Sequence, residues 1–317
     1  MTSQVDTYTS TGCKLIKHPM LVTEWVANKK PVPQSLQVAP TEHCNLNCKF
    51  CSVANRSRKY VFDFDKLKKA TLDFLLLGIK TVEITGGGEA LLYPKINQYL
   101  EYILQFNLEV GLITNGTVIN SVLDKDLMNR LSWIRISANV LDYRDKIDIP
   151  KDFPGTLGFS YVWTEGLSTK EQLIKIRDIA IENNAKYVRL VPNCLSTKEQ
   201  QKQRNDFLAP LAEELGSPIF FQQKNFDTPP KCYWGYFKPF LYCDEYVYPC
   251  SSTVLNPDAD KQFNSSYRWC HCSEIRDIWE RPINSIVDTS RCEHCVFAEQ
   301  NKLLEYMITP QGHENFI

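Results

Sequence analysis

The sequence predicts an α/β fold in which helices flank a parallel sheet. From residue 36 onward, short apolar segments alternate with segments of helical periodicity. A strand, a helix and another strand in succession form a parallel pair with a helical crossover. Six such strand–helix units fall short of the eight in a closed barrel.

Each expected strand is a short apolar segment, and each expected helix repeats its apolar residues at helical spacing, as between Leu67 and Leu77. The expected strands cover residues 36–40, 81–84, 110–113, 133–137, 157–163 and 187–191. The expected helices cover residues 63–77, 96–106, 122–131, 170–183 and 198–215, and a short helix at 21–28 precedes the sheet.

The composition of this 317-residue chain allows a substantial core, since 43% of its residues are hydrophobic. The net charge of −1 gives no overall attraction to nucleic acid or to an anionic membrane. There is no 18-residue apolar run and no signal-peptide pattern, so we expect a soluble, cytoplasmic protein. Twelve cysteines in such a protein indicate metal ligation rather than disulfides.

Three cysteines, Cys44, Cys48 and Cys51, follow the first expected strand with the spacing C-x3-C-x2-C. Structural zinc sites are usually closed by four protein ligands, and thiolates also hold iron–sulfur clusters. A cubane cluster with three thiolates keeps one iron free to bind a small molecule, which favours a reactive cluster. The alternatives are three unrelated buried cysteines, or three of four zinc ligands.

Residues 41–51, with the aromatic Phe50 before the third cysteine, resemble the cluster motif of the radical S-adenosylmethionine (SAM) enzymes. The resemblance implies a partial (β/α)6 TIM-like barrel, here residues 36–228, with its active site at the carboxyl ends of the strands. It implies a [4Fe–4S] cluster that binds SAM, and an external one-electron donor of the flavodoxin or ferredoxin type. An electron from this cluster would cleave SAM to a 5′-deoxyadenosyl radical, which abstracts hydrogen from a substrate.

Two further motifs at strand ends resemble parts of the family's SAM site. Gly87, Gly88 and Glu89 follow the second strand and resemble a G-G-E motif whose backbone and glutamate bind the SAM amino group. Taken alone, these glycines would predict a tight turn. Asn115 ends the third strand in an Asn-Gly pair, which either lines the active site, as the resemblance implies, or is an ordinary turn.

The fourth and sixth strands carry the remaining candidates for SAM binding. Arg135, Ser137 and Asn139 alternate and would share one face of a strand. The resemblance implies that Ser137 and Asn139 bind the SAM ribose, although many relatives have aspartate in place of Asn139. Arg189 would pair with the SAM carboxylate, with the substrate or with a surface acid. The basic run at 56–59 is expected to be a solvated loop or a contact to an anionic substrate group.

Seven of the cysteines follow residue 230, and Pro229-Pro230 is a plausible boundary. We therefore expect residues 1–35 to form an N-terminal extension and residues 229–317 to form a small cysteine-rich α+β domain. The run 241–250 resembles the hairpin entering the auxiliary-cluster domains called SPASM and twitch, with Glu245 where glycine is usual. Asn301 stands where a full SPASM domain has a further cysteine, so the shorter twitch domain fits better.

The twitch resemblance implies one auxiliary [4Fe–4S] cluster with four ligands: Cys232, Cys250, Cys292 and Cys295. A zinc site closed by the same cysteines is the structural alternative. Cys243, Cys270 and Cys272 have no assigned role, although the Cys270-His271-Cys272 run could replace one pair or hold a second ion.

An auxiliary cluster suits oxidation, because a substrate radical can lose its electron to it. The twitch dehydrogenases oxidise a secondary alcohol in this way, so we favour a radical SAM oxidoreductase with a small-molecule substrate. Peptide modification, nucleoside or nucleic-acid modification and a non-catalytic metal-binding role are the alternatives. The near-neutral charge counts against a polyanion, and the short N-terminal extension counts against a peptide-recognition module.

Overall fold

The computed structural model describes residues 4–10, 14–54, 56–223, 227–229, 231–253, 267–280, 287–289, 292, 295–310 and 312. Its strands are β1 Ser35–Ala39, β2 Thr81–Ile84, β3 Glu109–Thr114, β4 Trp133–Ser137, β5 Thr156–Trp163, β6 Tyr187–Pro192, β7 Ile219–Phe221, β8 Lys231–Cys232, β9 Phe240–Tyr242, β10 Tyr246–Tyr248, β11 Cys270–His271 and β12 Val287–Asp288. Its α-helices are α1 Gln4–Tyr8, α2 Pro19–Asn28, α3 Phe64–Leu77, α4 Ile96–Leu104, α5 Ile119–Val122, α6 Lys125–Met128, α7 Lys170–Glu182, α8 Lys198–Leu215, α9 Trp234–Phe237, α11 Ile275–Trp279 and α12 Ala298–Ile308. Its 3₁₀ helices are η1 Lys14–Lys17, η2 Ala90–Leu92, η3 Ala138–Asp142 and η4 Ser251–Thr253.

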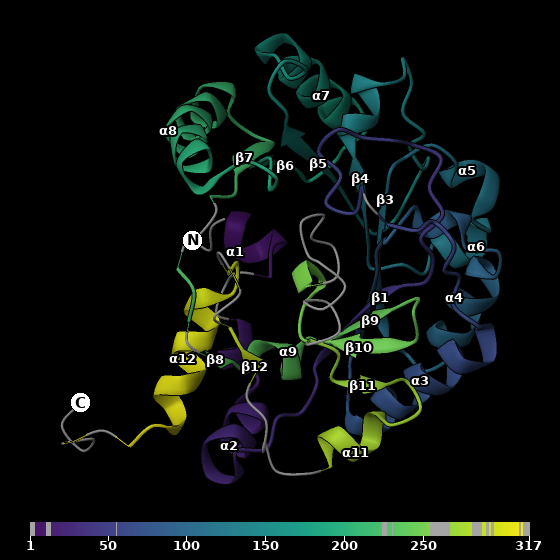
Figure 1. Ribbon diagram of the computed structural model, residues 1–317. Helices are drawn as coiled ribbons and strands as arrows, with labels where there is room; N and C mark the ends of the chain where they lie inside the picture. Colours follow the sequence, from purple (N-terminus) through teal and green to yellow (C-terminus); the bar gives the residue numbers. More distant parts are fainter. Residues whose placement is uncertain are drawn as a thin grey trace.

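One large sheet organises the molecule, with the strand order β11-β10-β9-β1-β2-β3-β4-β5-β6-β7. Strands β1 to β7 pair in parallel with their neighbours, as the alternating pattern predicts. Strand β9 also pairs in parallel with β1, whereas β10 and β11 are antiparallel. Figure 1 shows the curved sheet with α3, α4, α5, α6 and α7 on its outer side. The predicted partial-barrel fold is therefore confirmed.

The two faces of the strands differ in polarity. In β1, β2, β4 and β6, alternate residues such as Leu36, Ile134 and Val188 are fully buried in the core with the helices. The residues between them point to the inner face and include polar groups: Gln37, Glu83, Arg135, Ser137 and Arg189. The inner face is therefore available for chemistry rather than for core packing.

The helices begin and end where local chemistry sets their limits. The Asp63 side chain accepts a hydrogen bond from the Lys66 backbone N–H at the start of α3, and Gly78 ends this helix with a φ of 114°. Thr197 and Gln200 form a reciprocal capping box at the start of α8. No helix in the described part of the chain is long and apolar enough to cross a membrane.

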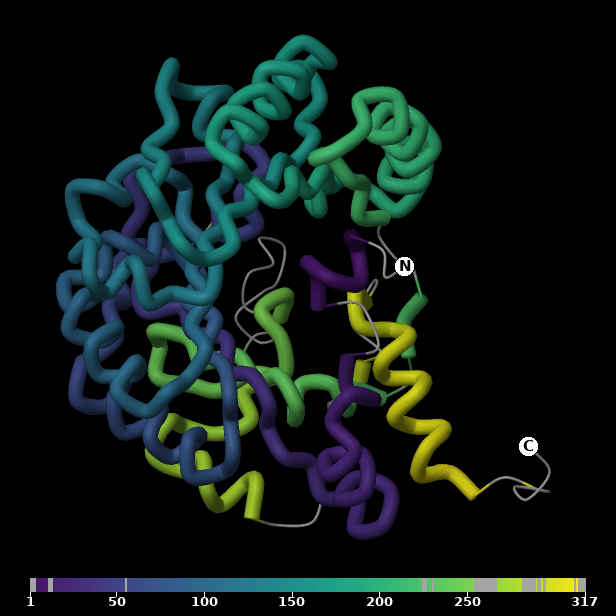
Figure 2. The backbone as a smooth tube through the Cα atoms, turned by 180° about the vertical axis from the view of Figure 1, so that it is seen from behind, coloured from purple at the N-terminus to yellow at the C-terminus, as the bar shows by residue number. Residues whose placement is uncertain are grey.

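The N-terminal segment packs against parts of the chain that are distant in sequence. The Tyr8 ring stacks on Tyr187 of β6 at 4.4 Å, and Lys238 Nζ donates to Ser10 Oγ at 2.8 Å. Both views show α1 between the β7 edge of the sheet and α12 (Figures 1 and 2). Trp25 of α2 is fully buried between Tyr233 and Phe237, and its Nε1 donates to Leu304 O at 2.9 Å.

Two expectations about the elements were wrong, and one strand was missed. The helix expected at 122–131 is two short helices, because Asp124 caps a second helix by accepting from the Asp126 N–H at 2.9 Å. The short strand β7 was not predicted. Strand β4 ends at Ser137, and Asn139 lies in η3, so Asn139 does not share the strand face of Arg135 and Ser137.

We predict that Trp25→Ala lowers the free energy of unfolding by about 3–5 kcal/mol, because it removes a large buried ring and leaves a backbone acceptor without its donor. Met20→Ala on the same helix is the matched control, because Met20 is 72% exposed; its effect should stay within about 0.5 kcal/mol. Guanidinium unfolding of both variants measures the difference. Equal losses in the two variants would contradict the packing described for α2.

Candidate functional site

The first cysteine group lies in the loop that follows β1 at the carboxyl edge of the sheet. Cys44, Cys48 and Cys51 are all partly exposed, and the Cys51 N–H donates to Cys48 O at 3.1 Å. Burial and the nearby thiols of Cys51 and Cys44 raise the pKa of Cys48 to about 12. The three thiols are therefore neighbours on one loop. Phe50 is partly buried in the turn between Cys48 and Cys51.

Glu42 fixes the start of this loop. Its side chain is buried, and its Oε1 accepts from the Tyr242 hydroxyl of β9 at 2.6 Å. Its Oε2 accepts from Ser57 Oγ at 2.5 Å and from the Lys59 N–H at 3.3 Å. The carboxylate thus joins both ends of the cysteine loop to the C-terminal hairpin.

Arg56 is partly exposed and bonds within the cysteine loop, whereas Arg58 and Lys59 of the same basic run are exposed. The Arg56 Nε donates to Glu42 O at 2.9 Å, and its Nη1 donates to Val53 O at 2.8 Å. The same Nη1 lies 3.3 Å from Cys51 Sγ. The guanidinium therefore folds back onto the cysteine loop and supplies a charged donor to one thiol.

The glycine loop after β2 packs directly on the cysteine loop. A Cβ on Gly88 would lie 2.1 Å from His43 O, and a Cβ on Gly87 would lie 2.6 Å from the Tyr242 ring. The Glu89 N–H donates to His43 O at 2.7 Å. Glycine at these positions is required by close backbone and ring contacts.

Glu89 links β2 to the end of β3. It is 2% exposed, and its Oε1 accepts from the Leu91 N–H at 3.1 Å and from Thr114 Oγ1 at 2.7 Å. Its Oε2 accepts from the Asn115 N–H at 2.7 Å. Burial raises the pKa of Glu89, although these three donors oppose the shift. A carboxylate accepts about four hydrogen bonds, so room for one further donor remains on Oε2.

Asn115 connects the end of β3 to the cysteine loop. Its Nδ2 donates to Asn45 Oδ1 at 2.9 Å and lies 3.9 Å from Cys44 Sγ. Asn45 in turn donates to Thr117 Oγ1 at 2.8 Å. The structure thus brings the predicted residues Glu89 and Asn115 together beside the first cysteine group.

Asn139 has a structural position that differs from the expected one. It is fully buried, its Oδ1 accepts from the Val162 N–H at 2.7 Å, and its Nδ2 donates to Val162 O and to Asp142. These bonds join η3 to β5 and leave Asn139 no exposed surface. Ser137 is partly exposed at the end of β4.

Asp142 is a residue near the site that the sequence did not reveal. It accepts from Asn139 and from the Tyr161 hydroxyl at 2.9 Å, and burial raises its pKa. Its charge acts on Cys48, and the adjacent Tyr143 hydroxyl accepts from the Lys49 N–H at 2.9 Å. No motif marks this pair, because η3 interrupts the strand pattern.

The four cysteines predicted for the second group lie close together although they come from three separate segments. Burial and the thiols of Cys250, Cys295 and Cys292 raise the pKa of Cys232. Backbone N–H groups point at the sulfurs: Gly235 donates to Cys232, Ser252 to Cys250 at 3.2 Å, and Phe297 to Cys295 at 3.3 Å. The described residues contain no disulfide.

Asn301 occupies a central place beside this second group. Its Oδ1 accepts from the Tyr233 and Trp234 N–H groups at 2.7 and 2.8 Å, and its Nδ2 lies 3.8 Å from Cys295 Sγ. It is 1% exposed. The Asn301 side chain thus fixes the backbone directly after Cys232 and contacts the sulfur of Cys295.

The other C-terminal cysteines lie around the hairpin turn. Cys243 and Cys270 are buried in the core. Glu245 adopts the left-handed region at a φ of 71°, so the turn forms without glycine. Ligand atoms of Glu245, His271 and Cys272 lie within 4.8 Å of one another, but Lys66 Nζ already lies 2.6 Å from Glu245. This ion pair supports the turn, and we assign no metal to it.

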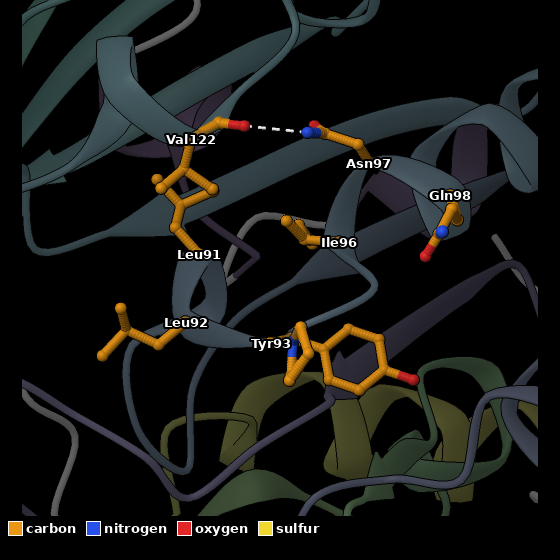
Figure 3. A pocket seen from close by; sticks show the side chains of 8 residues that line it. Leu91, Leu92, Tyr93, Ile96, Asn97, Gln98 and Val122 are labelled. Atoms are coloured by element: carbon orange, nitrogen blue, oxygen red, sulfur yellow. Dashed lines mark hydrogen bonds between the residues drawn. The ribbon is translucent and has the colours of Figure 1, made fainter.

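A surface pocket of about 420 Å³ lies away from both cysteine groups, between η2, α4 and α5. Its lining contains no cysteine, histidine or acidic side chain, and Asn97 donates to Val122 O across one side at 2.8 Å (Figure 3). It therefore offers no group that would take part in the chemistry.

Comparisons with known proteins agree with this geometry. Residues 38–153 match the family model of the Radical SAM superfamily. Over 100 residues the chain is 32% identical to the antilisterial bacteriocin subtilosin biosynthesis protein AlbA of Bacillus subtilis (strain 168), covering 31% of this chain and 22% of AlbA. Over 144 residues it is 24% identical to the S-adenosylmethionine-dependent nucleotide dehydratase of Thermoplasmatales archaeon (strain ISO4-H5), covering 45% and 46%.

A solved structure supports the fold. The crystal structure of Streptococcus suis SuiB bound to precursor peptide SuiA has a TM-score of 0.58 at 15% identity, covering 90% of this chain and 74% of SuiB. The aligned segments span less than half the length of AlbA and of the dehydratase. The resemblance of residues 41–51 to the radical SAM motif is confirmed.

We predict that Arg56→Gln lowers the reduction potential of a cluster on the first cysteine group. A cationic donor stabilises the extra negative charge of the reduced state, so its loss should shift the potential down by roughly 50–100 mV. Arg58→Gln is the matched control, because Arg58 bonds to Asn47 Oδ1 and makes no bond to a sulfur within the described part of the chain. Redox titration followed by electron paramagnetic resonance measures both. Equal potentials in the two variants would show that the Arg56–Cys51 contact has no electrostatic role.

Proposed function

We propose that this chain, which carries a radical SAM domain over residues 38–153, uses two iron–sulfur clusters to oxidise a small-molecule substrate. The observation that carries this proposal is the pairing of a three-cysteine loop at the carboxyl edge of the sheet with a separate four-cysteine group. The three cysteines of the first group would leave one position of a cluster without a protein ligand. The four cysteines of the second group would occupy every position. An external one-electron donor and a cytoplasmic location belong to the same proposal.

The residues of the first group fit a cluster that keeps one position open. Cys44, Cys48 and Cys51 would hold it, and Arg56 and Asn115 would donate to two of the three sulfurs. A [4Fe–4S] cluster bound there would supply the electron that cleaves SAM, and SAM would supply the radical that takes hydrogen from the substrate. The chain's own contribution is to hold the loop, which Glu42 does through Tyr242 and Ser57.

The residues around Glu89 fit the polar end of SAM. Glu89 has capacity for one more donor on Oε2, which suits an ammonium group, and the backbone at Gly87 and Gly88 allows close approach. Asn115, Ser137 and Phe50 stay in the proposed binding set. We leave Asn139 out of it, because its side chain is fully buried and bonds to Val162 and Asp142.

The second group fits an electron-transfer role. Cys232, Cys250, Cys292 and Cys295 would close the site, so a cluster there has no position for substrate. An auxiliary cluster bound there would take up the electron left on the substrate after hydrogen abstraction. The neutral N–H donors of Gly235, Ser252 and Phe297 would set the reduction potential of that auxiliary cluster.

Peptide modification is the second candidate. The observation that favours it is the 32% identity to AlbA, a bacteriocin biosynthesis protein, across 100 residues. Detection of an oxidised small molecule or of a modified peptide among the products distinguishes the two candidates.

We predict that the reconstituted protein cleaves SAM to 5′-deoxyadenosine under reducing, anaerobic conditions. Cys48→Ala should abolish this cleavage, because it removes one of three ligands to the open cluster. Cys194→Ala is the control, since Cys194 is exposed and belongs to neither group. Chromatography with mass detection measures the product. Cleavage by Cys48→Ala at the rate of the control would refute the radical SAM assignment.

We predict about eight iron atoms per chain after anaerobic reconstitution, and about four in Cys232→Ser, since each [4Fe–4S] cluster holds four. Cys194→Ser should keep the full content. Iron and sulfide analysis with a parallel zinc assay measures this. About four irons in both wild type and Cys232→Ser, with one zinc in the wild type, would make the second group structural.

A further inference from the structure

Two arginines face the inner side of the barrel from the two strands that flank β5. Arg135 lies on β4 and Arg189 on β6, both at inward positions between fully buried core residues. The charge of Arg135 acts directly on Arg189. Glu83 of β2 and Lys238, which precedes β9, lie on the same inner face.

The only acid in this group is already paired. Glu83 Oε2 accepts from Lys238 Nζ at 3.0 Å, and its Oε1 accepts from Gln37 Nε2 at 2.7 Å. Burial acts to raise the pKa of Glu83, but Lys238 and Arg135 hold it below its usual range, so the carboxylate stays charged. One negative charge therefore faces three positive ones, and the lysine is its bonded partner.

Neither arginine forms an ion pair or a hydrogen bond with a carboxylate among the described residues, although the charge of Glu83 acts on both from a distance. Arg189 Nη1 donates to the neutral Gln222 Oε1 at 3.1 Å, and the Arg135 guanidinium lies 5.7 Å from the Trp133 ring. The Nε atoms of both side chains are inaccessible to solvent and have no hydrogen-bond partner. Burial and the charge of Arg135 lower the pKa of Arg189 to about 9.

Such an arrangement is unfavourable for the folded chain by itself. Buried charges are normally paired, and two like charges in a poorly solvated region repel each other. Perturbed, uncompensated charges are typical of binding sites, where a ligand supplies the missing partner. A guanidinium presents its donors in a planar fork that matches a carboxylate or a phosphate.

We infer that Arg135 and Arg189 together bind an oxyanion of the substrate, a carboxylate or a phosphate, on the inner face of the barrel. Only the assignment of this anion to the substrate rests on the proposed function. Arg135 precedes Ser137 by two residues on β4, which places it about 6–7 Å further from the carboxyl edge. Arg189 lies level with Ser137 across β5, because both residues pair with Ser160. The oxyanion would thus lie between these two levels, next to the residues proposed for SAM.

Aromatic rings border this position on the amino-terminal side. The Trp133 ring covers Gly111 and the Tyr187 ring covers Gly158, where a Cβ would lie 2.0 and 2.2 Å from the rings. Tyr8 from α1 stacks on Tyr187. These rings exclude water from one side, which strengthens the attraction between a guanidinium and an anion.

The test uses the cluster-loaded, full-length protein under anaerobic conditions, with inorganic phosphate and malonate as probes in chloride buffer. Calorimetric titration should show binding of at least one probe, weakened about tenfold in Arg135→Met or Arg189→Met, since each removes charge-assisted bonds. Arg130→Met is the matched control, because Arg130 bonds to Leu104 O on the outer side. The control should bind the probes as wild type does.

The melting temperature and the affinity for SAM distinguish an oxyanion site from other roles of the two arginines. In chloride alone, the melting temperature of the two variants should equal or exceed that of wild type, because an uncompensated charge is removed. The affinity for SAM should change less than twofold. Probe binding that is unchanged in both variants overturns the inference, and so does a loss of SAM affinity, which would assign the pair to the SAM carboxylate. Arg189→Lys keeps the charge and provides a second variant should either methionine variant fail to fold.

Failure of the inference and failure of the proposed function give different results. Anion binding is measured without turnover, whereas the proposed function is tested by formation of 5′-deoxyadenosine. A protein that cleaves SAM but binds neither probe refutes only the oxyanion site.

Discussion

The geometry of the first cysteine loop depends on one buried hydrogen bond, between the Tyr242 hydroxyl and Glu42 Oε1 at 2.6 Å. Burial and the neighbouring Cys243 raise the pKa of Tyr242, so its hydroxyl remains a proton donor to the carboxylate. The same ring lies against Gly87, where any side chain would collide with it. One tyrosine from the C-terminal part of the chain therefore contacts both loops that the proposed SAM site requires, and the pairing of β9 with β1 places it there.

This arrangement explains why the two cysteine groups are structurally linked although they are far apart in sequence. The hairpin β9–β10 continues the large sheet, and Cys250 lies two residues after the end of β10. A change in the conformation of the hairpin would therefore displace both Glu42 and Cys250. Lys238 makes a similar connection on the inner face. Its Nζ donates hydrogen bonds to Glu83 of β2 and to Ser10, and so joins both to the segment before β9.

The sequence predicted what depends on spacing and periodicity, and missed what depends on tertiary contacts. The parallel strands, the cysteine loop and the proximity of Glu89 and Asn115 follow from strand ends meeting at one edge of a sheet. The seventh strand was too short to detect. Asn139 was assigned to a strand face because η3 leaves no signal in the pattern. Asp142 and the Arg56–Cys51 contact depend on how loops fold back, which no local pattern encodes.

The inner face shows that polar residues on alternating strands need not be solvated surface. Glu83, Arg135 and Arg189 alternate with core residues, as the polar residues of a half-exposed strand do. Helices cover the outer face of the curved sheet, and these three residues lie partly exposed on its inner face. Because β1 to β7 are parallel, their inward residues converge on one volume, where charges interact strongly. A chain selected for stability alone would fill that volume with apolar side chains. The retention of two guanidinium groups that bond to no carboxylate among the described residues is therefore the feature of this barrel that most directly supports the proposed oxyanion site.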